Sequence, residues 1–303
     1  MTPSVDSMRL RALALEVLKS VSKKGDCIAI TGSVARGNAT RDSELDLWIL
    51  GSRSGRFTKN VHGTNVQLLC QRPEEAVAFD NLCLFEVDDL LLLDDRAGAF
   101  EALRRVWKKQ RRRVRAEVIR GTQKQTELEL ARGQQGSEWH RATFLRLAAW
   151  RLLCLRVFID HGWRVPRLHA LRASLPKPLS KRLDEVLALP KPANARAAVK
   201  LMKGVEREAR QHVDLGDYAL PHALDAKVKT APDEAAFLAR QELVSDLLPA
   251  VFNTWGITDV RGVELLGRVA PNTAKAFQLL EPRPKKGDVK KLQAHVAAIQ
   301  RAL

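Results

Sequence analysis

Hydrophobic and polar residues follow two different patterns along the chain, and the change comes shortly before residue 100. Residues 5–22 repeat apolar positions every three or four residues, which predicts an amphipathic helix. Its expected apolar face comprises Val5, Met8, Ala12, Leu15, Leu18 and Val21. Short apolar runs between turn residues then predict strands at 27–31, 45–50, 65–71 and 85–93, with a helix at 73–81. This first part therefore has the pattern of a small mixed α/β domain.

Beyond Gly98 the strand pattern ends and helical periodicity takes over. It covers residues 99–118, 138–161, 193–213, 232–254 and 286–302, and prolines fall mostly where helices would begin or end. The predicted fold class is α+β. An N-terminal mixed-sheet domain at residues 1–96 is followed by an all-α domain at residues 97–303.

The composition is that of a folded protein with room for two cores. The chain has 303 residues, of which 45% are hydrophobic and 28% charged. No apolar stretch reaches the roughly 18 residues of a membrane span, and the N-terminus lacks the pattern of a secretion signal. We therefore expect a cytoplasmic protein without a membrane partner. Cys27, Cys70, Cys83 and Cys154 lie in apolar runs without C-x-x-C spacing, which favours buried free thiols.

The net charge of +16 is unevenly distributed. Residues 1–96 hold 12 basic and 14 acidic residues, which gives a net charge of −2. Residues 97–303 hold the other 39 basic and 21 acidic residues, which gives a net charge of +18. Such asymmetry is typical of a surface that binds polyanions, of which nucleic acid is the commonest in a cytoplasm. The alternative is a basic but merely solvated helical surface.

Two acids occupy neighbouring positions on one predicted strand. Because side chains alternate across a strand, Glu44 and Asp46 project from the same face, opposite Leu45 and Leu47. Two such anions repel each other in a half-buried place unless a cation lies between them. Carboxylate oxygens suit Mg²⁺, which also binds water and phosphate. The alternative is an exposed edge strand with ordinary solvated acids.

A glycine turn precedes these acids. In ITGSVARG, residues 30–37, an apolar strand leads through Gly32 and Ser33 toward a short helix. Glycine lets backbone N–H groups approach an anion closely, and Ser33 adds a hydroxyl, so the turn is a candidate phosphate site. Arg36 is a further candidate phosphate contact, although arginine is also common on helix surfaces.

These motifs together resemble the DNA polymerase β superfamily of nucleotidyltransferases. The shared pattern is an apolar residue before Gly-Ser, a gap, and then acid, apolar, acid, apolar. In this chain the last four are residues 44–47, ELDL. The resemblance is greatest to small nucleotidyltransferase domains of antibiotic-modifying enzymes and toxin–antitoxin pairs, which often precede a helical bundle. It implies that Gly32 and Ser33 hold an NTP, while Glu44 and Asp46 bind Mg²⁺ and are catalytic.

The chain departs from the family pattern in two places. Glu44 stands where the family usually has Asp, and Asp42 lies on the same alternation and is a candidate to compensate. Many members carry a third acid on the next strand, where this chain has Gln67, which cannot accept a proton. Either Glu86 or Asp88, on one face of the predicted strand 85–93, supplies the general base, or the chemistry is lost. The alternative for these two acids is a solvated strand end or a helix cap.

A dense basic segment opens the helical part. Residues 104–115, RRVWKKQRRRVR, carry eight positive charges in about three helical turns, too many for acidic partners within the chain. The candidate nucleic-acid contacts are Lys108, Lys109, Arg111, Arg112, Arg113 and Arg115, with Trp107 available for stacking. In the alternative interpretation, Trp107 belongs to the core with Val106 and Val114, and the charges are solvated.

The predicted function is Mg²⁺-dependent transfer of a nucleoside monophosphate from an NTP to an acceptor hydroxyl. The basic helical part favours an RNA acceptor such as a tRNA end. Two alternatives stay open: a transferase acting on an aminoglycoside-type antibiotic, and a catalytically inactive nucleotide- or RNA-binding protein, which Gln67 would favour.

Overall fold

The computed structural model describes residues 2–41, 43–77, 87–161, 168–212, 224–248, 252 and 256–303. The chain divides into two compact units, residues 1–117 and 118–303, and each is described by itself. The division falls inside helix α4 (Ala99–Arg132), later than the boundary predicted at residue 96. The first turns of α4 belong with the N-terminal unit because Phe100 of α4 stacks edge-on against Trp48 of the sheet.

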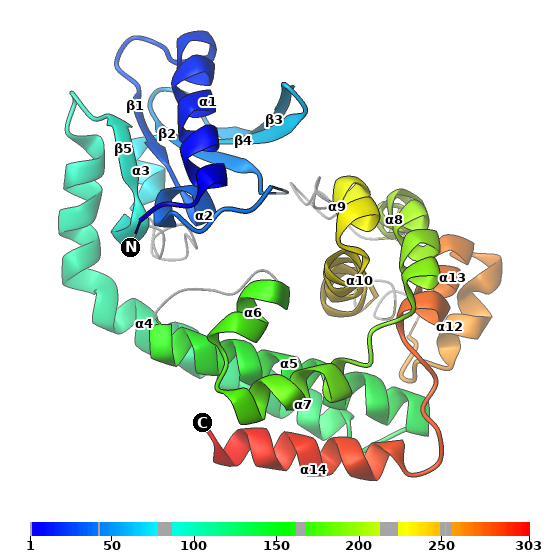
Figure 1. Cartoon of the computed structure of the whole chain (residues 1–303). Coiled ribbons are helices and arrows are strands. Elements are labelled where there is room, and N and C mark those ends of the chain that lie inside the picture. The colour runs from blue at the N-terminus through cyan, green and yellow to red at the C-terminus, as the bar shows by residue number, and fades with distance from the viewer. Residues whose placement is uncertain are drawn as a thin grey trace. The chain divides into compact units, whose positions relative to one another are not determined.

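The N-terminal unit is built on a mixed five-stranded sheet, as predicted for the fold class (Figure 1). Its strands are β1 (Cys27–Ile30), β2 (Leu45–Leu50), β3 (Gly55–Val61), β4 (Thr64–Gln71) and β5 (Leu91–Asp94). They are ordered β3-β4-β2-β1-β5. Among the described strands, β2 and β4 pair in parallel, while the other neighbours are antiparallel. Strand β2 therefore lies at the centre, with both of its edges paired.

Helix α1 (Val5–Val21) covers one face of this sheet (Figure 1). The helix itself is predicted correctly, but the apolar face expected from the sequence is largely wrong. Val5, Met8 and Leu15 are 78%, 52% and 55% exposed. The buried face instead comprises Ser7, Leu10, Ala14, Val17 and Val21. Ser7 lies on this face because its hydroxyl accepts a hydrogen bond from the Ala39 backbone N–H at 3.0 Å, so apolar spacing alone selected the wrong stripe.

The opposite face of the sheet is covered by the start of α4. Trp48 and Phe100 have ring centroids 5.7 Å apart in an edge-on arrangement, and the Trp48 indole N–H donates to Gln71 Oε1 at 2.9 Å. Because side chains alternate on β2, Asp46 lies on the same face as Trp48. The two candidate acids thus belong to the face that α4 covers in part.

Strand β3 is absent from the sequence prediction. It is an edge strand with almost all residues exposed, so it needs no apolar pattern. His62 and Gly63 form its turn into β4, both with positive φ, at 50° and 77°. Such two-residue turns are a hairpin signal, and this one could have revealed the strand. Strand β5 is shorter than the predicted strand 85–93.

Short helices complete the N-terminal unit. They are α2 (Gly32–Arg36) and α3 (Pro73–Ala76), each at a predicted position, and α3 is shorter than the helix expected at 73–81.

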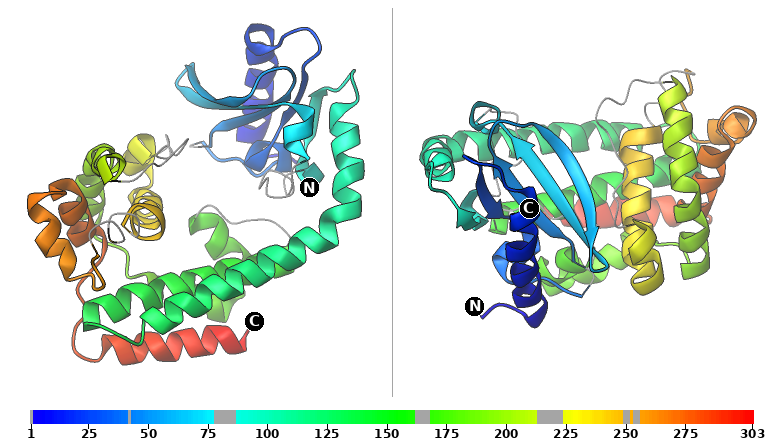
Figure 2. Two further views of the ribbon diagram at one scale, coloured as in Figure 1. Left: turned by 180° about the vertical axis from the view of Figure 1, so that it is seen from behind. Right: turned by 90° about the horizontal axis from the view of Figure 1, so that it is seen from above.

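Helices are the only regular secondary structure among the described residues of the second unit. Its elements are the end of α4, α5 (Glu138–His161), α6 (Leu168–Ser174), α7 (Lys177–Leu187), α8 (Pro192–His212), α9 (Leu224–Thr230), α10 (Pro232–Gln241), the π-helical η2 (Glu242–Leu247), α12 (Gly262–Leu265), the 3₁₀ turn η3 (Leu266–Arg268), α13 (Pro271–Leu280) and α14 (Asp288–Arg301). Helix α14 packs along α5, and α13 packs on α8 (Figure 2). One core cluster joins α8, α10 and α13, and the other joins α5, α7 and α14.

Several composition-based expectations can be compared with this packing. Cys27 and Cys70 are buried free thiols and Cys154 is a half-buried one, whereas Cys83 lies outside the described residues. Burial raises the pKa of all three described thiols, that of Cys154 to about 12. In the described part of the chain, no helix is both long and apolar enough to cross a membrane.

Candidate functional site

The two acids lie at the start of the central strand. Glu44 directly precedes β2 and Asp46 is its second residue, so both side chains project from one face. Glu44 is only 7% exposed, whereas Asp46 is half-buried. The side chain of Ser43 stabilises the loop before Glu44, a role that the sequence analysis did not predict. Its hydroxyl accepts a hydrogen bond from the Thr40 backbone N–H at 2.9 Å. Because β2 is paired with β1 on one edge and with β4 on the other, neither acid is on an exposed edge strand.

The glycine turn lies directly against Asp46. The backbone N–H of Thr31 donates to the Asp46 carbonyl at 2.9 Å, which ties the end of β1 to the acid strand. Gly32 has a φ of +67°, and a Cβ on it would come within 2.8 Å of Asp46 Oδ2. Any other residue would be strained by the left-handed backbone, and its Cβ would displace the Asp46 carboxylate. Ser33, the next residue, is half-buried in α2. The structure thus brings together the turn and the acid that the sequence connected by spacing alone.

Gln67 lies beside the acids at the position predicted from the resemblance. It pairs with Asp46 in the parallel β2–β4 register. Its side-chain amide donates to Glu44 Oε2 at 2.5 Å. The other carboxylate oxygen, Glu44 Oε1, is buried without a hydrogen-bond partner among the described residues. A buried carboxylate oxygen without a partner is unfavourable by about 1–3 kcal/mol, so a cation or a hydrogen-bond donor placed against this oxygen would stabilise it.

These residues fit a magnesium ion. The orphaned Glu44 oxygen and the Asp46 carboxylate offer hard oxygen ligands on adjacent positions of one face, the donor set that Mg²⁺ takes when phosphate supplies other ligands. Within the described residues, no group of three or more His, Cys, Asp or Glu side chains could hold a metal ion. Among the described residues of this face, Glu44 and Asp46 are the carboxylates that could contribute ligands, and the Gln67 amide cannot add a third.

The comparison with protein families agrees with this geometry. Residues 12–114 match the family model of the nucleotidyltransferase domain. This segment is a nucleotidyltransferase domain of the polymerase β-like superfamily. The match begins in α1 and ends in α4, so it contains the whole sheet and both candidate acids. No curated protein matches the chain significantly.

Two further acids of the N-terminal unit, Asp88 and Asp89, form ion pairs with arginines. Residues 87–89 form a 3₁₀ turn ahead of β5 rather than part of a strand. In this turn Asp88 pairs with Arg111 of α4, and Asp89 pairs with Arg36 of α2, each at 3.3 Å. Arg36, the candidate phosphate contact, therefore holds a carboxylate in this structure. Two other candidates, Asp42 and Glu86, lie outside the described residues.

The basic segment exposes its charges and buries its aromatic residue. Lys108, Lys109, Arg111, Arg112 and Arg113 are exposed on α4, and Arg115 is half-buried. Trp107 is only 3% exposed and Val114 is 4% exposed, so the expectation that Trp107 is available for stacking is wrong. The helix places Trp107 on the apolar stripe with Phe100 and Leu103, which packs inward. Trp139 and Trp150 also pack against core clusters, as expected, and Trp163 lies outside the described residues.

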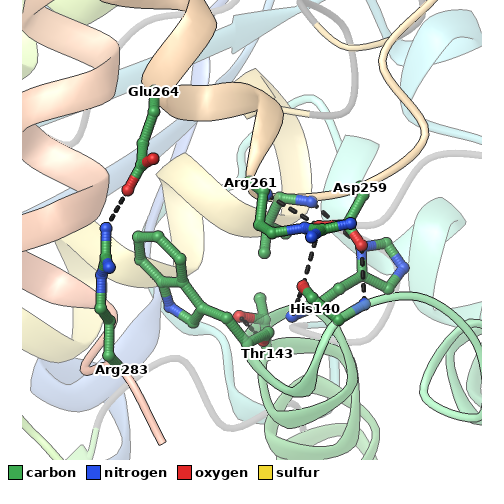
Figure 3. Close-up of polar contacts among 9 residues, drawn as sticks. His140, Thr143, Asp259, Arg261, Glu264 and Arg283 are labelled. Carbon is green, nitrogen blue, oxygen red and sulfur yellow. Dashed lines mark hydrogen bonds and ion pairs between the residues drawn. The ribbon is translucent and has the colours of Figure 1, made fainter.

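A Ser, a His and an Asp also meet outside the nucleotidyltransferase domain, at the start of α5 (Figure 3). The Ser137 hydroxyl donates to Asp259 Oδ1 at 2.9 Å, and His140 Nδ1 accepts the Val260 backbone N–H at 3.2 Å. The Ser137 hydroxyl thus donates to aspartate rather than to the histidine ring, which is not the arrangement that nucleophilic catalysis needs. Burial would raise the pKa of Asp259, but hydrogen bonds, first from the Arg261 and Ser137 backbones, hold it below its usual value. This cluster anchors a loop to the helix.

Proposed function

We propose that this chain is a Mg²⁺-dependent nucleotidyltransferase that moves a nucleoside monophosphate from an NTP to a hydroxyl of RNA. Nucleotidyl transfer as the general activity rests on the domain at residues 12–114. The observation that carries the finer proposal is the close approach of Gly32 to the Asp46 carboxylate beside the orphaned oxygen of Glu44. This arrangement supports a joint site for triphosphate and metal.

Each residue of the site has a proposed task. Glu44 and Asp46 would hold Mg²⁺, which when bound neutralises charge on the phosphates during transfer. Gly32 lets the triphosphate approach the backbone closely, and Ser33 offers a hydroxyl to it. Gln67 holds Glu44 in place through its amide. Since an amide cannot take a proton, the base for the acceptor hydroxyl is assigned to Glu86 or Asp88.

The exposed charges of α4 support RNA as the acceptor. Several of them lie on consecutive turns of the helix, and residues 97–303 carry a balance of +18. Phosphate contacts of this kind give binding that depends on charge rather than on base sequence. A cationic aminoglycoside would be repelled by such a surface, which favours RNA over that alternative.

The first experiment tests the chemistry. The full chain is incubated with labelled NTPs, Mg²⁺ and total tRNA, and transfer of label is compared between wild type, Asp46→Asn and Asp160→Asn. Asp160 forms a surface ion pair with Arg156, so its variant makes the same chemical change away from the site. We expect transfer by wild type and Asp160→Asn and none by Asp46→Asn. Absence of transfer to RNA by the wild type would overturn the proposal, and retained Mg²⁺-dependent NTP binding would then favour the inactive binder.

The second experiment tests the RNA surface. Lys108→Glu/Lys109→Glu is compared with Lys290→Glu/Lys291→Glu, since both pairs are exposed neighbours on helices. Removing one phosphate contact should reduce the salt slope of RNA binding by about 0.7 to 0.9. We expect the slope to fall in the α4 variant and to stay unchanged in the α14 variant. Equal effects in both would show that only the overall charge matters.

A further inference from the structure

Helix α8 carries a row of positive charges along its outer side. Its exposed cationic residues recur every three or four positions, and they are Arg196, Lys200, Lys203, Arg207 and Arg210. At about 100° per residue, they lie within an arc of about 80° around the helix. The buried residues of α8 lie on the opposite side, in the core cluster with α10 and α13, and include Ala198, Met202 and Val205. The row therefore faces away from the core of its unit.

The acids of α8 do not neutralise this row. The helix contains two acidic residues, Glu206 and Glu208. Glu208 is buried and accepts the backbone N–H groups of Asn272 and Thr273 at 2.9 and 2.8 Å, so it caps α13 instead. Glu206 pairs with Arg210 at 3.0 Å, at the end of the row. No described residue forms an ion pair with three other members of the row, which are Arg196, Lys200 and Arg207.

The exposed side of α8 favours base-paired RNA over a membrane or a single strand. A helix that lies on a membrane places large apolar side chains beside its cations. None of the exposed large apolar side chains of the described residues lies on α8. The helix also has no Phe, Tyr or Trp on which the bases of a single strand could stack. Base-paired RNA needs neither, because proteins recognise its shape through phosphates and 2′-hydroxyls.

The length of the row suits a short stretch of duplex. Arg210 follows Arg196 by fourteen positions, which is about 21 Å along the helix axis. This corresponds to roughly six base pairs at about 3.4 Å each. We propose that the exposed row of α8 binds the phosphate backbone of a base-paired stem in the RNA acceptor. The choice of RNA rests on the proposed function, whereas binding to the row is measured without any transfer.

The salt dependence of RNA binding tests this surface. A short RNA duplex and an unpaired single strand of the same length are titrated with the full chain, without NTP, at several salt concentrations. Wild type is compared with Arg196→Gln/Lys200→Gln/Arg207→Gln, since glutamine removes the charge and is a good helix former. Loss of three phosphate contacts should reduce the salt slope for the duplex by about 2 to 3. The slope for the single strand should change by less than one contact, about 0.7.

A matched variant separates the row from the overall charge. Lys177→Gln/Lys181→Gln/Arg301→Gln removes the same number of exposed charges from α7 and α14, and it should leave both slopes unchanged. Equal losses in the two variants would overturn the proposal, as would equal losses for duplex and single strand in the α8 variant. No binding of the duplex by the wild type would overturn it too.

Two competitors test the other classes of partner. Polyglutamate at the same concentration of charge stands for an acidic protein, and phosphatidylserine vesicles stand for a membrane. Neither should displace the duplex from the wild type, and displacement by either one as effective as that by unlabelled duplex would refute the choice of RNA. A chain that binds the duplex through α8 but transfers no nucleotide would refute the proposed function alone, because these measurements contain no transfer step.

Discussion

Replacing Gly32 with alanine tests how closely the glycine turn and the acid strand depend on each other. The added methyl group acts in two ways. It forces a φ of +67° on a residue that has a Cβ, and it places that Cβ within 2.8 Å of Asp46 Oδ2. The first effect concerns only the backbone, whereas the second moves the carboxylate proposed to bind metal.

The two effects can be given separate magnitudes. A left-handed backbone is unfavourable by roughly 1–2 kcal/mol for a residue other than glycine. Moving the Asp46 side chain off its rotamer adds about 0.5–1.5 kcal/mol. Gly32→Ala should therefore lower the free energy of unfolding by about 1.5–3.5 kcal/mol. Gly98 has a φ of +70°, and a methyl group added to it would meet no described atom within 4 Å, so Gly98→Ala should show the backbone effect alone.

A double-mutant cycle with Asp46→Ala separates these effects by urea unfolding. Once Asp46 has lost its carboxylate, Gly32→Ala should destabilise the protein no more than Gly98→Ala does. Mg²⁺-dependent NTP binding, followed with a fluorescent NTP analogue, should weaken in Gly32→Ala, and nucleotidyl transfer should fall about 100-fold, since a misplacement near 1 Å can slow a reaction by that factor. Both should be unchanged in Gly98→Ala. If Gly32→Ala bound NTP like the wild type, the joint site would be refuted.

Three further measurements address the rest of the molecule. Gln67→Glu removes the donor to Glu44 and adds a like charge, so it should lower stability by about 1–3 kcal/mol without metal. Mg²⁺ should then raise its unfolding temperature more than that of the wild type, and an equal rise would contradict the metal assignment. Burial lowers the pKa of His140, so the stability it contributes is present above its unfolded pKa of about 6.5 and is lost as pH falls through the folded value. Urea unfolding between pH 7.5 and 5.5 should show a smaller loss for His140→Gln, and identical pH profiles would refute this role. Leu10→Ala should destabilise the protein by about 2–5 kcal/mol and Leu15→Ala by at most about 0.5 kcal/mol; similar effects would contradict the observed face of α1.

Local patterns predicted much of the fold. Strands β1, β2 and β4 and the long helices α5 and α8 lie close to their predicted ranges, because buried strands and long amphipathic helices carry strong periodic signals. The exposed edge strand β3 has no such signal. The apolar run that follows residues 87–89 led to the prediction of one strand over 85–93. In the structure, residues 87–89 form a turn instead, and Asp88 and Asp89 pair with arginines from two helices.

By itself the sequence determined that Glu44 and Asp46 share a face and that a glycine turn precedes them, because alternation along a strand and the freedom of glycine are local properties. Only the tertiary structure decided that Gly32 lies against Asp46, that the Gln67 amide reaches Glu44, and that Trp107 is buried. These facts depend on strand register and on which face of a helix meets the sheet. Both are set by contacts between residues far apart in the chain, which no local spacing records.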